Sequence, residues 1–374
     1  MTRALVITIT AIITLCVLLA ESVSAHPAWG IVIDRNNQIY FSDIETVWKI
    51  DAQGKLTVFR AGVSGRHTHD LNIDEAGNLY GADNSYEPAT QRFFSAIWKM
   101  TPGGGFSYLL ASTDNPPEGT SIWRDRDGNM YHVTNYPERE LLVLKRTPNG
   151  NVTALVGSSN AVREYRQGSP YSIGGMAFGS EGALYFTDNS NVRKVTMDGR
   201  MTMLARNLTV ENPAETPMPE SPVTRLFGIA VDAEGNAFVA DYGNRRVLKV
   251  TSSGAVSTVA RAEKPWSPTG VALKDGNLYI LEFGFTPPST YTPRVRKLSS
   301  DGRITVLATV GENANPAARE NPASGNTALT IEPKRNAPHA LTDVAAATGV
   351  FALTVIVWLL RREYLLSNSK ITKV

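Results

Sequence analysis

GIAVDAEGNAFVADYGNRRVLKVTSSGAVSTVA, residues Gly228–Ala260, contains four short apolar runs separated by turns. The runs GIAVD, NAFVAD, RVLKVT and AVSTVA contain many β-branched residues, and every turn between them contains glycine. β-branched residues favour strands, and glycine permits tight turns. This stretch therefore predicts four consecutive antiparallel strands.

The same pattern occurs six times, at starts about 40–53 residues apart. The copies are Trp29–Phe59, Asp70–Asp83 with Ala96–Leu110, Ser121–Asn135 with Leu141–Leu155, Gly175–Leu204, Gly228–Ala260, and Gly270–Phe283 with Arg294–Leu307. One four-stranded unit cannot bury both of its faces, whereas packing such units around a ring buries them. We therefore predict an all-β fold, a six-bladed β-propeller with four strands in each blade. The sequence leaves open how the ring closes.

Two copies resemble a known repeat. GIAVDAEGNAFVADYGNRRVLKV (Gly228–Val250) looks like the NHL repeat, and GMAFGSEGALYFTDNSNVRKV (Gly175–Val195) is similar to it. The resemblance covers residues 29–307 and implies NHL-type blades. NHL-like propellers include extracellular sensor domains, partner-binding modules, and relatives that are lyases or lactonases. The resemblance thus indicates a fold rather than one function.

The two ends of the chain are apolar. Residues 1–25 have the pattern of a secretory signal peptide, with Arg3 before an apolar core and small residues up to Ala25. Residues 344–360 carry no charge and precede two arginines, which predicts a C-terminal transmembrane helix. The predicted plan is a propeller over 26–310, a flexible linker over 311–343, and a cytoplasmic tail over 361–374. A buried soluble helix is the alternative for residues 344–360.

This plan predicts a single-pass protein of the cell membrane whose propeller lies outside the cytoplasm, in the periplasm or the extracellular space. The net charge of +2 gives no indication of nucleic-acid binding. The single cysteine, Cys16, lies within the predicted signal, so the exported part has no disulfide.

The two faces of the predicted ring differ. First–second and third–fourth strand turns are short and contain glycine, whereas the connections on the other face, which we call the top face, are long. The longest top-face connections are Asn84–Phe94, Gly157–Ile173, Arg206–Arg225 and Phe283–Pro293. Long loops on a rigid scaffold favour binding. Aromatic residues there, including Tyr86, Tyr136, Tyr242 and Phe283, favour a protein, peptide or glycan ligand.

Every second strand ends in a polar residue. These residues are Asp43, Asp83, Asn135, Asp188, Asp241 and Glu282. One interpretation is a polar ring at the channel mouth that binds a cation or a polar ligand. The other is that each carboxylate accepts backbone N–H groups in the turn that follows, which Asp and Asn do well. Repetition in every blade favours the second interpretation.

One copy begins irregularly, with RHTHD at residues 66–70. The sequence makes His67, His69 and Asp70, with Glu118 on the next blade, a candidate ligand site at the channel entry. Consecutive strand residues face opposite ways, so His69 and Asp70 are not expected to bind the same metal ion. His132, inside the second strand of copy three, is left out of this site.

HDLNIDEAGNLYGAD (His69–Asp83) is similar to blade starts of peptidylglycine amidating lyase, a zinc propeller, and this resemblance implies His69 as one ligand. The matching entry positions of the other copies are Trp29, Thr120, Gly174, Phe227 and Thr269. None is histidine, so the three-histidine zinc pattern is incomplete. The metal triad of the regucalcin/gluconolactonase family is also incomplete, because Glu118 lies three residues before the glycine position of its copy instead of directly before it, and no Asn or Asp fills the other entries. No cofactor is predicted; zinc or calcium is the low-ranked alternative.

Two functions follow. The first is an exported, membrane-anchored propeller that binds a ligand or a protein partner through its top face. The alternative is a metal-dependent lyase or hydrolase, lactonase-like, that acts at the central channel. The sequence names no catalytic residue.

Overall fold

A computed structural model describes residues 27–135, 141–157, 173–212, 214, 216–217, 224–286 and 290–311. All belong to the first of two compact units, residues 1–320. The predicted signal, transmembrane run and tail lie outside the described residues, as does the linker after Gly311. Within the described part, no helix has the length and apolar character needed to cross a bilayer.

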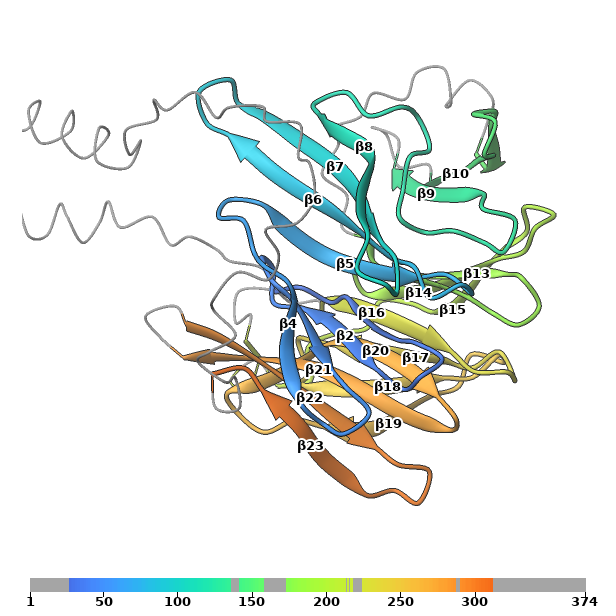
Figure 1. Cartoon of the computed structure of the whole chain (residues 1–374). Coiled ribbons are helices and arrows are strands. Elements are labelled where there is room, and N and C mark those ends of the chain that lie inside the picture. Colours follow the sequence, from blue (N-terminus) through green and yellow to red (C-terminus); the bar gives the residue numbers. More distant parts are fainter. Residues whose placement is uncertain are drawn as a thin grey trace, which may run out of the picture. The chain divides into compact units, whose positions relative to one another are not determined.

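The described chain forms six antiparallel sheets that follow one another in sequence (Figure 1). Blade 1 contains β1 (Ile31–Ile33), β2 (Ile39–Ser42), β3 (Val47–Ile50) and β4 (Leu56–Arg60). Blade 2 contains β5 (His67–Ile73), β6 (Leu79–Glu87), β7 (Arg92–Met100) and β8 (Phe106–Thr113). Blade 3 contains β9 (Met130–Asn135), β10 (Leu141–Arg146) and β11 (Val152–Val156). Blade 4 contains β12 (Ile173–Phe178), β13 (Leu184–Asp188), β14 (Asn191–Val195) and β15 (Met201–Ala205). Blade 5 contains β16 (Leu226–Val231), β17 (Ala237–Asp241), β18 (Arg246–Val250) and β19 (Val256–Arg261). Blade 6 contains β20 (Trp266–Lys274), β21 (Asn277–Thr286), β22 (Thr290–Leu298) and β23 (Ile304–Thr309).

The six-bladed propeller predicted from the repeats is therefore present. Five blades have four strands each. In blade 3 the innermost strand is reduced to a single β-bridge, which joins Arg124 to Met130.

Neighbouring blades bury apolar side chains between them, and these clusters show how the ring closes. Phe41 of blade 1 and Leu281 of blade 6 belong to one buried cluster, so the first blade packs directly against the last. Five further clusters join blades 1–2, 2–3, 3–4, 4–5 and 5–6 in turn. Each blade is built from consecutive strands, and no strand is exchanged between the chain ends in the described residues.

Glycines set the spacing of the innermost strands. A Cβ added to Gly175 would lie 2.8 Å from the Cα of Gly228, and one added to Gly228 would lie 2.8 Å from the Cα of Gly270. Such distances exclude any side chain, so only glycine allows these strands to come this close. Gly30 brings blade 1 equally close to Asp70 of blade 2. Blade 2 has Asp70 and blade 3 has Ser121 in place of this glycine, so the contacts of blade 2 with blade 3 and of blade 3 with blade 4 lack the glycine that the other close contacts use.

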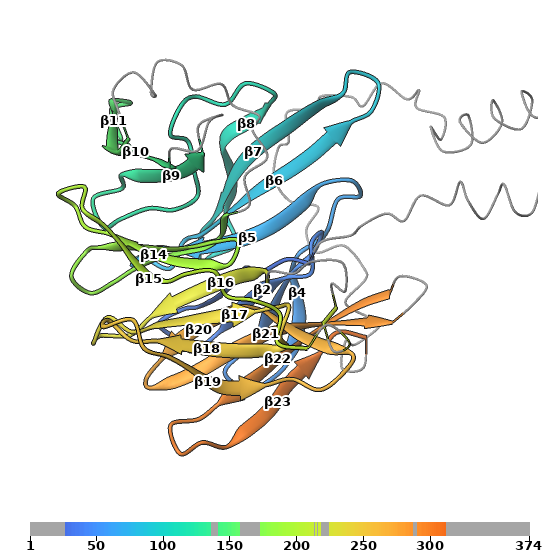
Figure 2. The ribbon, with the colours of Figure 1, turned by 180° about the vertical axis from the view of Figure 1, so that it is seen from behind.

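Two predicted top-face loops are instead projecting hairpins. Residues 84–94 mostly continue β6 and β7, which pair as far as Glu87 and Arg92. Residues 283–293 continue β21 and β22 in the same way. Figures 1 and 2 show both hairpins projecting to the same side of the ring. The loop prediction was wrong there because β-prone aromatic and threonine residues extend the strand pairs beyond the repeat.

Candidate functional site

A cavity of about 300 Å³ lies between blades 2 and 3, beside the ring axis. Its lining includes the top-half residues Asn84 of β6, Ser95 of β7 and Gly174 of β12, so it lies in the half of the ring that carries the top face. Asp70 and Ser121, which stand where other blades have glycine, both line the cavity. Their side chains keep the inner strands of blades 2 and 3 apart, which explains why the cavity lies there.

His69 and Asp70 both line this cavity. The register of β5 on β6 shifts between Thr68 and Leu71, so these two residues occupy a β-bulge. A bulge interrupts the alternation of side chains along a strand. The bulge therefore lets two consecutive residues line one cavity, which strand periodicity alone does not predict. Inner strands β12, β16 and β20 show the same kind of shift.

An aromatic stack crosses the axis at this level. The ring of Trp29 lies 5.3 Å from that of His69, with 17° between the planes, and 5.4 Å from that of Phe227, with 12° between the planes. Tyr242 packs edge-on against Phe227 at 5.3 Å. The stack thus joins entry residues of blades 2, 1 and 5.

Asp70 fixes the position of Trp29. The indole Nε1–H of Trp29 donates to Asp70 Oδ2 at 2.7 Å, and the backbone N–H of Leu71 donates to Oδ1 at 2.7 Å. Burial raises the pKa of Asp70 well above its usual range, and these two hydrogen bonds only partly oppose that rise. The protonated form of Asp70 is therefore favoured more strongly in the folded protein than it is for an exposed aspartate.

His132 also lines the cavity, from β9 of blade 3. Burial lowers its pKa from 6.5 to about 4, so the imidazole is neutral at pH 7. His132 is not among the site residues predicted from the sequence. Strand alternation gives one indication of its position. Tyr131 and Val133 are buried on one side of β9, so His132 between them faces the other side.

A second cavity of about 330 Å³ follows the axis below the stack. Its lining comes from the innermost segments of all six blades. Trp29, Asp70, Trp123 and Met176 line both cavities, so these four residues lie between the upper cavity and the axial channel.

Of the four predicted ligands at the channel entry, His67 and His69 are close, with ring centroids 5.7 Å apart. Glu118 is exposed and does not line the cavity; its backbone carbonyl accepts a hydrogen bond from Arg146 at 3.1 Å. Across the described ranges, no group of three His, Cys, Asp or Glu side chains is arranged to hold a metal ion.

The predicted aromatic residues do not form one patch. Tyr86 is exposed on the β6–β7 hairpin, whereas Tyr242 and Phe283 are buried. Tyr136 lies outside the described residues. Only Tyr242 is connected to the cavity, through the aromatic stack.

The acidic residues that end the second strands are held within the blades. Arg60 donates to both carboxylate oxygens of Asp83, at 3.0 and 2.6 Å. Asp188, Asp241 and Glu282 form ion pairs with arginines of the third strand of their own blade. Three of these four arginine-paired acids are fully buried or nearly so, with 0–2% exposure, and Asp83 has 4%.

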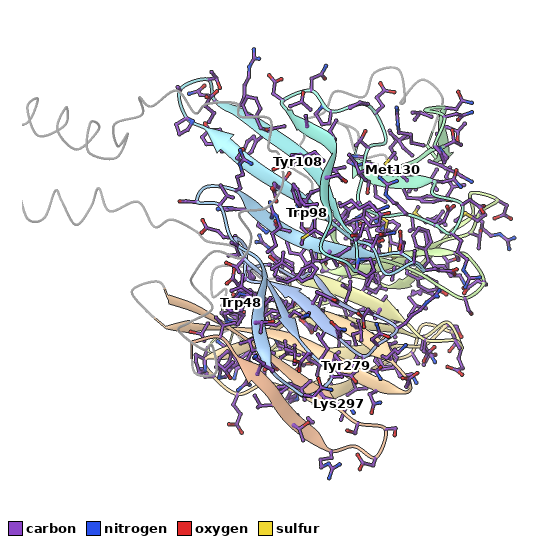
Figure 3. The ribbon with its side chains drawn as sticks, in the orientation of Figure 1. Trp48, Trp98, Tyr108, Met130, Tyr279 and Lys297 are labelled. Atoms are coloured by element: carbon purple, nitrogen blue, oxygen red, sulfur yellow. The ribbon has the colours of Figure 1, made fainter. Side chains whose placement is uncertain are left out.

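Asp43 accepts backbone N–H groups of its turn, at 2.7 Å from Thr46, together with the indole N–H of Trp48. Trp98 makes the matching indole hydrogen bond to Asp83 in blade 2, at 2.9 Å. Figure 3 labels both tryptophans. The side chain of Asn135 is outside the described part, and none of the five acids lines either cavity.

No protein-family model matches the sequence, and no curated protein matches it in a sequence search. The structure is similar to virginiamycin B lyase from Staphylococcus aureus, with 15% identity, a TM-score of 0.42, and 75% of this chain and 83% of that chain covered. It is also similar to a putative gluconolactonase, with 16% identity, a TM-score of 0.46, and coverage of 76% and 92%.

A gluconolactonase of Xanthomonas campestris has 14% identity, a TM-score of 0.42, and coverage of 68% and 83%. At these values we transfer no activity, and the assignment of the fold rests on the six sheets themselves. The NHL repeat stays a prediction. The described chain is an all-β, six-bladed propeller.

Proposed function

We propose that this propeller binds a small, uncharged, hydroxyl-rich ring compound in the cavity between blades 2 and 3. The observation that carries the proposal is the composition of the lining, which has two indoles, seven polar side chains, and no lysine, arginine or glutamate. The polar side chains are His69, Asp70, Asn84, Ser95, Thr120, Ser121 and His132. Its volume of about 300 Å³ is at the lower end of the range for small-ligand sites.

The indole of Trp123 supplies a flat apolar surface on which a ring can pack, and Trp29, which is stacked on His69 and Phe227, adds apolar lining beside it. The polar side chains around them supply donors and acceptors for hydroxyl groups, in the mixed arrangement that is typical of ligand sites. Trp29 is already held by Asp70, so binding needs little ordering of this surface.

The charge state supports an uncharged ligand. His132 is neutral at pH 7, and the protonated form of Asp70 is favoured by burial. An anionic ligand would lose hydration here without meeting a lysine or arginine in the lining. A cationic ligand would meet only Asp70, whose ionised form is disfavoured by burial and whose two oxygens already accept hydrogen bonds from Trp29 and Leu71. The cavity therefore favours sugars over sugar acids or amino sugars.

Calorimetry tests this preference. The probes are uncharged mono- and disaccharides, with glucuronate and glucosamine as charged counterparts. We expect an uncharged probe to bind wild type more tightly than its charged counterpart, and Ala82→Leu, which fills the cavity, to abolish this binding. Ala52→Leu, at an exposed turn on the opposite face, is the matched control. Equal binding of charged and uncharged probes, or unchanged binding by Ala82→Leu, would overturn the proposal.

We also propose that the chain is exported and anchored in the membrane by residues 344–360, as the sequence predicts. A protein, peptide or glycan partner, as the sequence predicts, is the alternative to lipid as the occupant of the top face beside the projecting hairpins.

The metal-dependent enzyme is the second candidate, carried by the closeness of His67 and His69. Metal analysis of the purified full chain tests it. Stoichiometric zinc or calcium that is lost in His69→Ala would support this candidate, and a metal-free protein with the same melting temperature after chelation would reject it.

A further inference from the structure

The β6–β7 hairpin extends well above the ring. In blades 4 and 5 the second strand ends at its acidic residue, but β6 continues for four residues after Asp83, to Glu87. Four residues of strand span about 13 Å. β21 of blade 6 likewise continues after Glu282, to Thr286. Blades 6 and 2 both pack against blade 1, so the two projections stand on either side of blade 1.

Both ends of the described chain lie on this same face. The backbone N–H of Trp29 donates to the carbonyl of His69 at the top of β5, immediately before β1 descends. At the other end, β23 rises from its lower turn, and the N–H of Val310 donates to the carbonyl of Pro293. The chain therefore enters blade 1 and leaves blade 6 from the top face, between the two hairpins.

The tip of the β6–β7 hairpin carries exposed aromatic side chains. Tyr86 is 49% exposed and Phe93 is 71% exposed, the largest value among the exposed large apolar residues of the described chain. The two residues are register partners, and their rings are 4.8 Å apart. Exposed aromatic pairs at a hairpin tip bury nothing within the blade, so their apolar area is available to a partner.

The tip is nearly neutral in charge. Glu87 is the cross-strand partner of Arg92, and Arg92 pairs with Asp114 at 2.5 Å. A partner recognised by this tip is therefore recognised through aromatic surface rather than charge. Phe and Tyr side chains are the type enriched where proteins meet the headgroup layer of a bilayer.

We propose that the top face over blades 6, 1 and 2 rests on a lipid bilayer, with Tyr86 and Phe93 in the headgroup layer. The uncharged run at residues 344–360 follows a segment of 32 residues after Gly311. As the flexible linker that the sequence predicts, this segment would span about 30 Å, so an anchor at residues 344–360 would keep this face near the membrane. The cavity between blades 2 and 3 then opens toward the membrane surface, and its ligand approaches from there.

Depth-resolved quenching tests the contact. The full chain, in a Cys16→Ser background, is placed in phosphatidylcholine nanodiscs that contain lipids with a nitroxide on the headgroup. An environment-sensitive dye is attached at Ala89→Cys on the hairpin tip, or at Ala52→Cys on the opposite face as the matched control; both alanines are exposed. We expect strong quenching at position 89 and little at position 52.

A double change separates aromatic contact from mere proximity. Tyr86→Ser with Phe93→Ser should reduce the quenching at position 89 several-fold, whereas Val306→Ser, which alters an equally exposed residue on β23, should not. Equal quenching at both dye positions, no quenching, a chain that does not join nanodiscs, or no effect of the double change would overturn the proposal. If a protein rather than lipid covers the tip, the dye stays unquenched. Ligand binding is measured separately, so the two proposals fail independently.

Discussion

At the residue scale, the site depends on two groups whose protonation is changed in opposite directions. Burial raises the pKa of Asp70 and lowers that of His132. The sequence predicted His69 and Asp70 as special because they replace residues of the repeat. It could not place His132 beside them, because only the folded ring brings the second strand of blade 3 to this cavity.

These two groups give opposite pH dependences of stability. An acid with a raised folded pKa binds more protons in the folded state, so its contribution is lost as the pH rises above about 4. His132 binds fewer protons in the folded state than in the unfolded state, so its contribution is lost as the pH falls from 6.5 toward 4. We expect the two effects to offset each other partly in wild type between pH 4 and 6.5.

Single variants should separate the two effects. Relative to wild type, Asp70→Asn should become more stable with rising pH, and His132→Gln should become less stable with rising pH. The His132 contribution is at most roughly 3 kcal/mol. Denaturant unfolding at intervals from pH 4 to 7 measures both, and parallel curves for all three proteins would contradict this assignment.

Arg60 is predicted to be essential to blade 2. Arg60→Met leaves the buried carboxylate of Asp83 without its cation, which costs about 3–5 kcal/mol. It also removes a guanidinium that lies 4.7 Å from the ring centre of Trp98. Chemical denaturation measures the loss. Arg200→Met, which breaks an exposed pair with Asp198, is the control and should change the midpoint little. Equal effects would show that burial is not what makes the Asp83 pair important.

At the scale of the element, glycines that recur in the inner strands allow neighbouring blades to pack closely around the axis. The sequence could predict the strands and turns, because both follow from local residue types. It could not predict the bulge at His69–Asp70 or the length of the β6–β7 hairpin. Both depend on how one strand registers on its neighbour rather than on the residues of one strand.

Gly228→Ala tests the packing role. Its new methyl group would meet the backbone of blade 6, so we expect a loss of about 1–3 kcal/mol. Gly103→Ala is the matched control, because the only atom near its Cβ is 4.0 Å away and belongs to a threonine side chain. Thermal unfolding of the two variants measures the difference, and similar melting temperatures would argue against close approach at the axis.

At the scale of the whole molecule, the ring is closed by packing between blades 1 and 6 rather than by exchange of a strand. The repeats predicted six blades, but contact between the first and last blades involves residues far apart in sequence. The cavity is a consequence of the same ring. It forms where two adjacent blades lack the glycines that bring the other inner strands together.

A crystallographic fragment screen of the protein with uncharged ring compounds tests directly whether the cavity between blades 2 and 3 is a ligand site. We expect bound fragments to concentrate between blades 2 and 3, in contact with Trp29, Trp123 and His132, and to be absent there in Ala82→Leu crystals. Fragments that bind only elsewhere, with this cavity empty or filled by water alone at the highest concentration, would contradict this expectation.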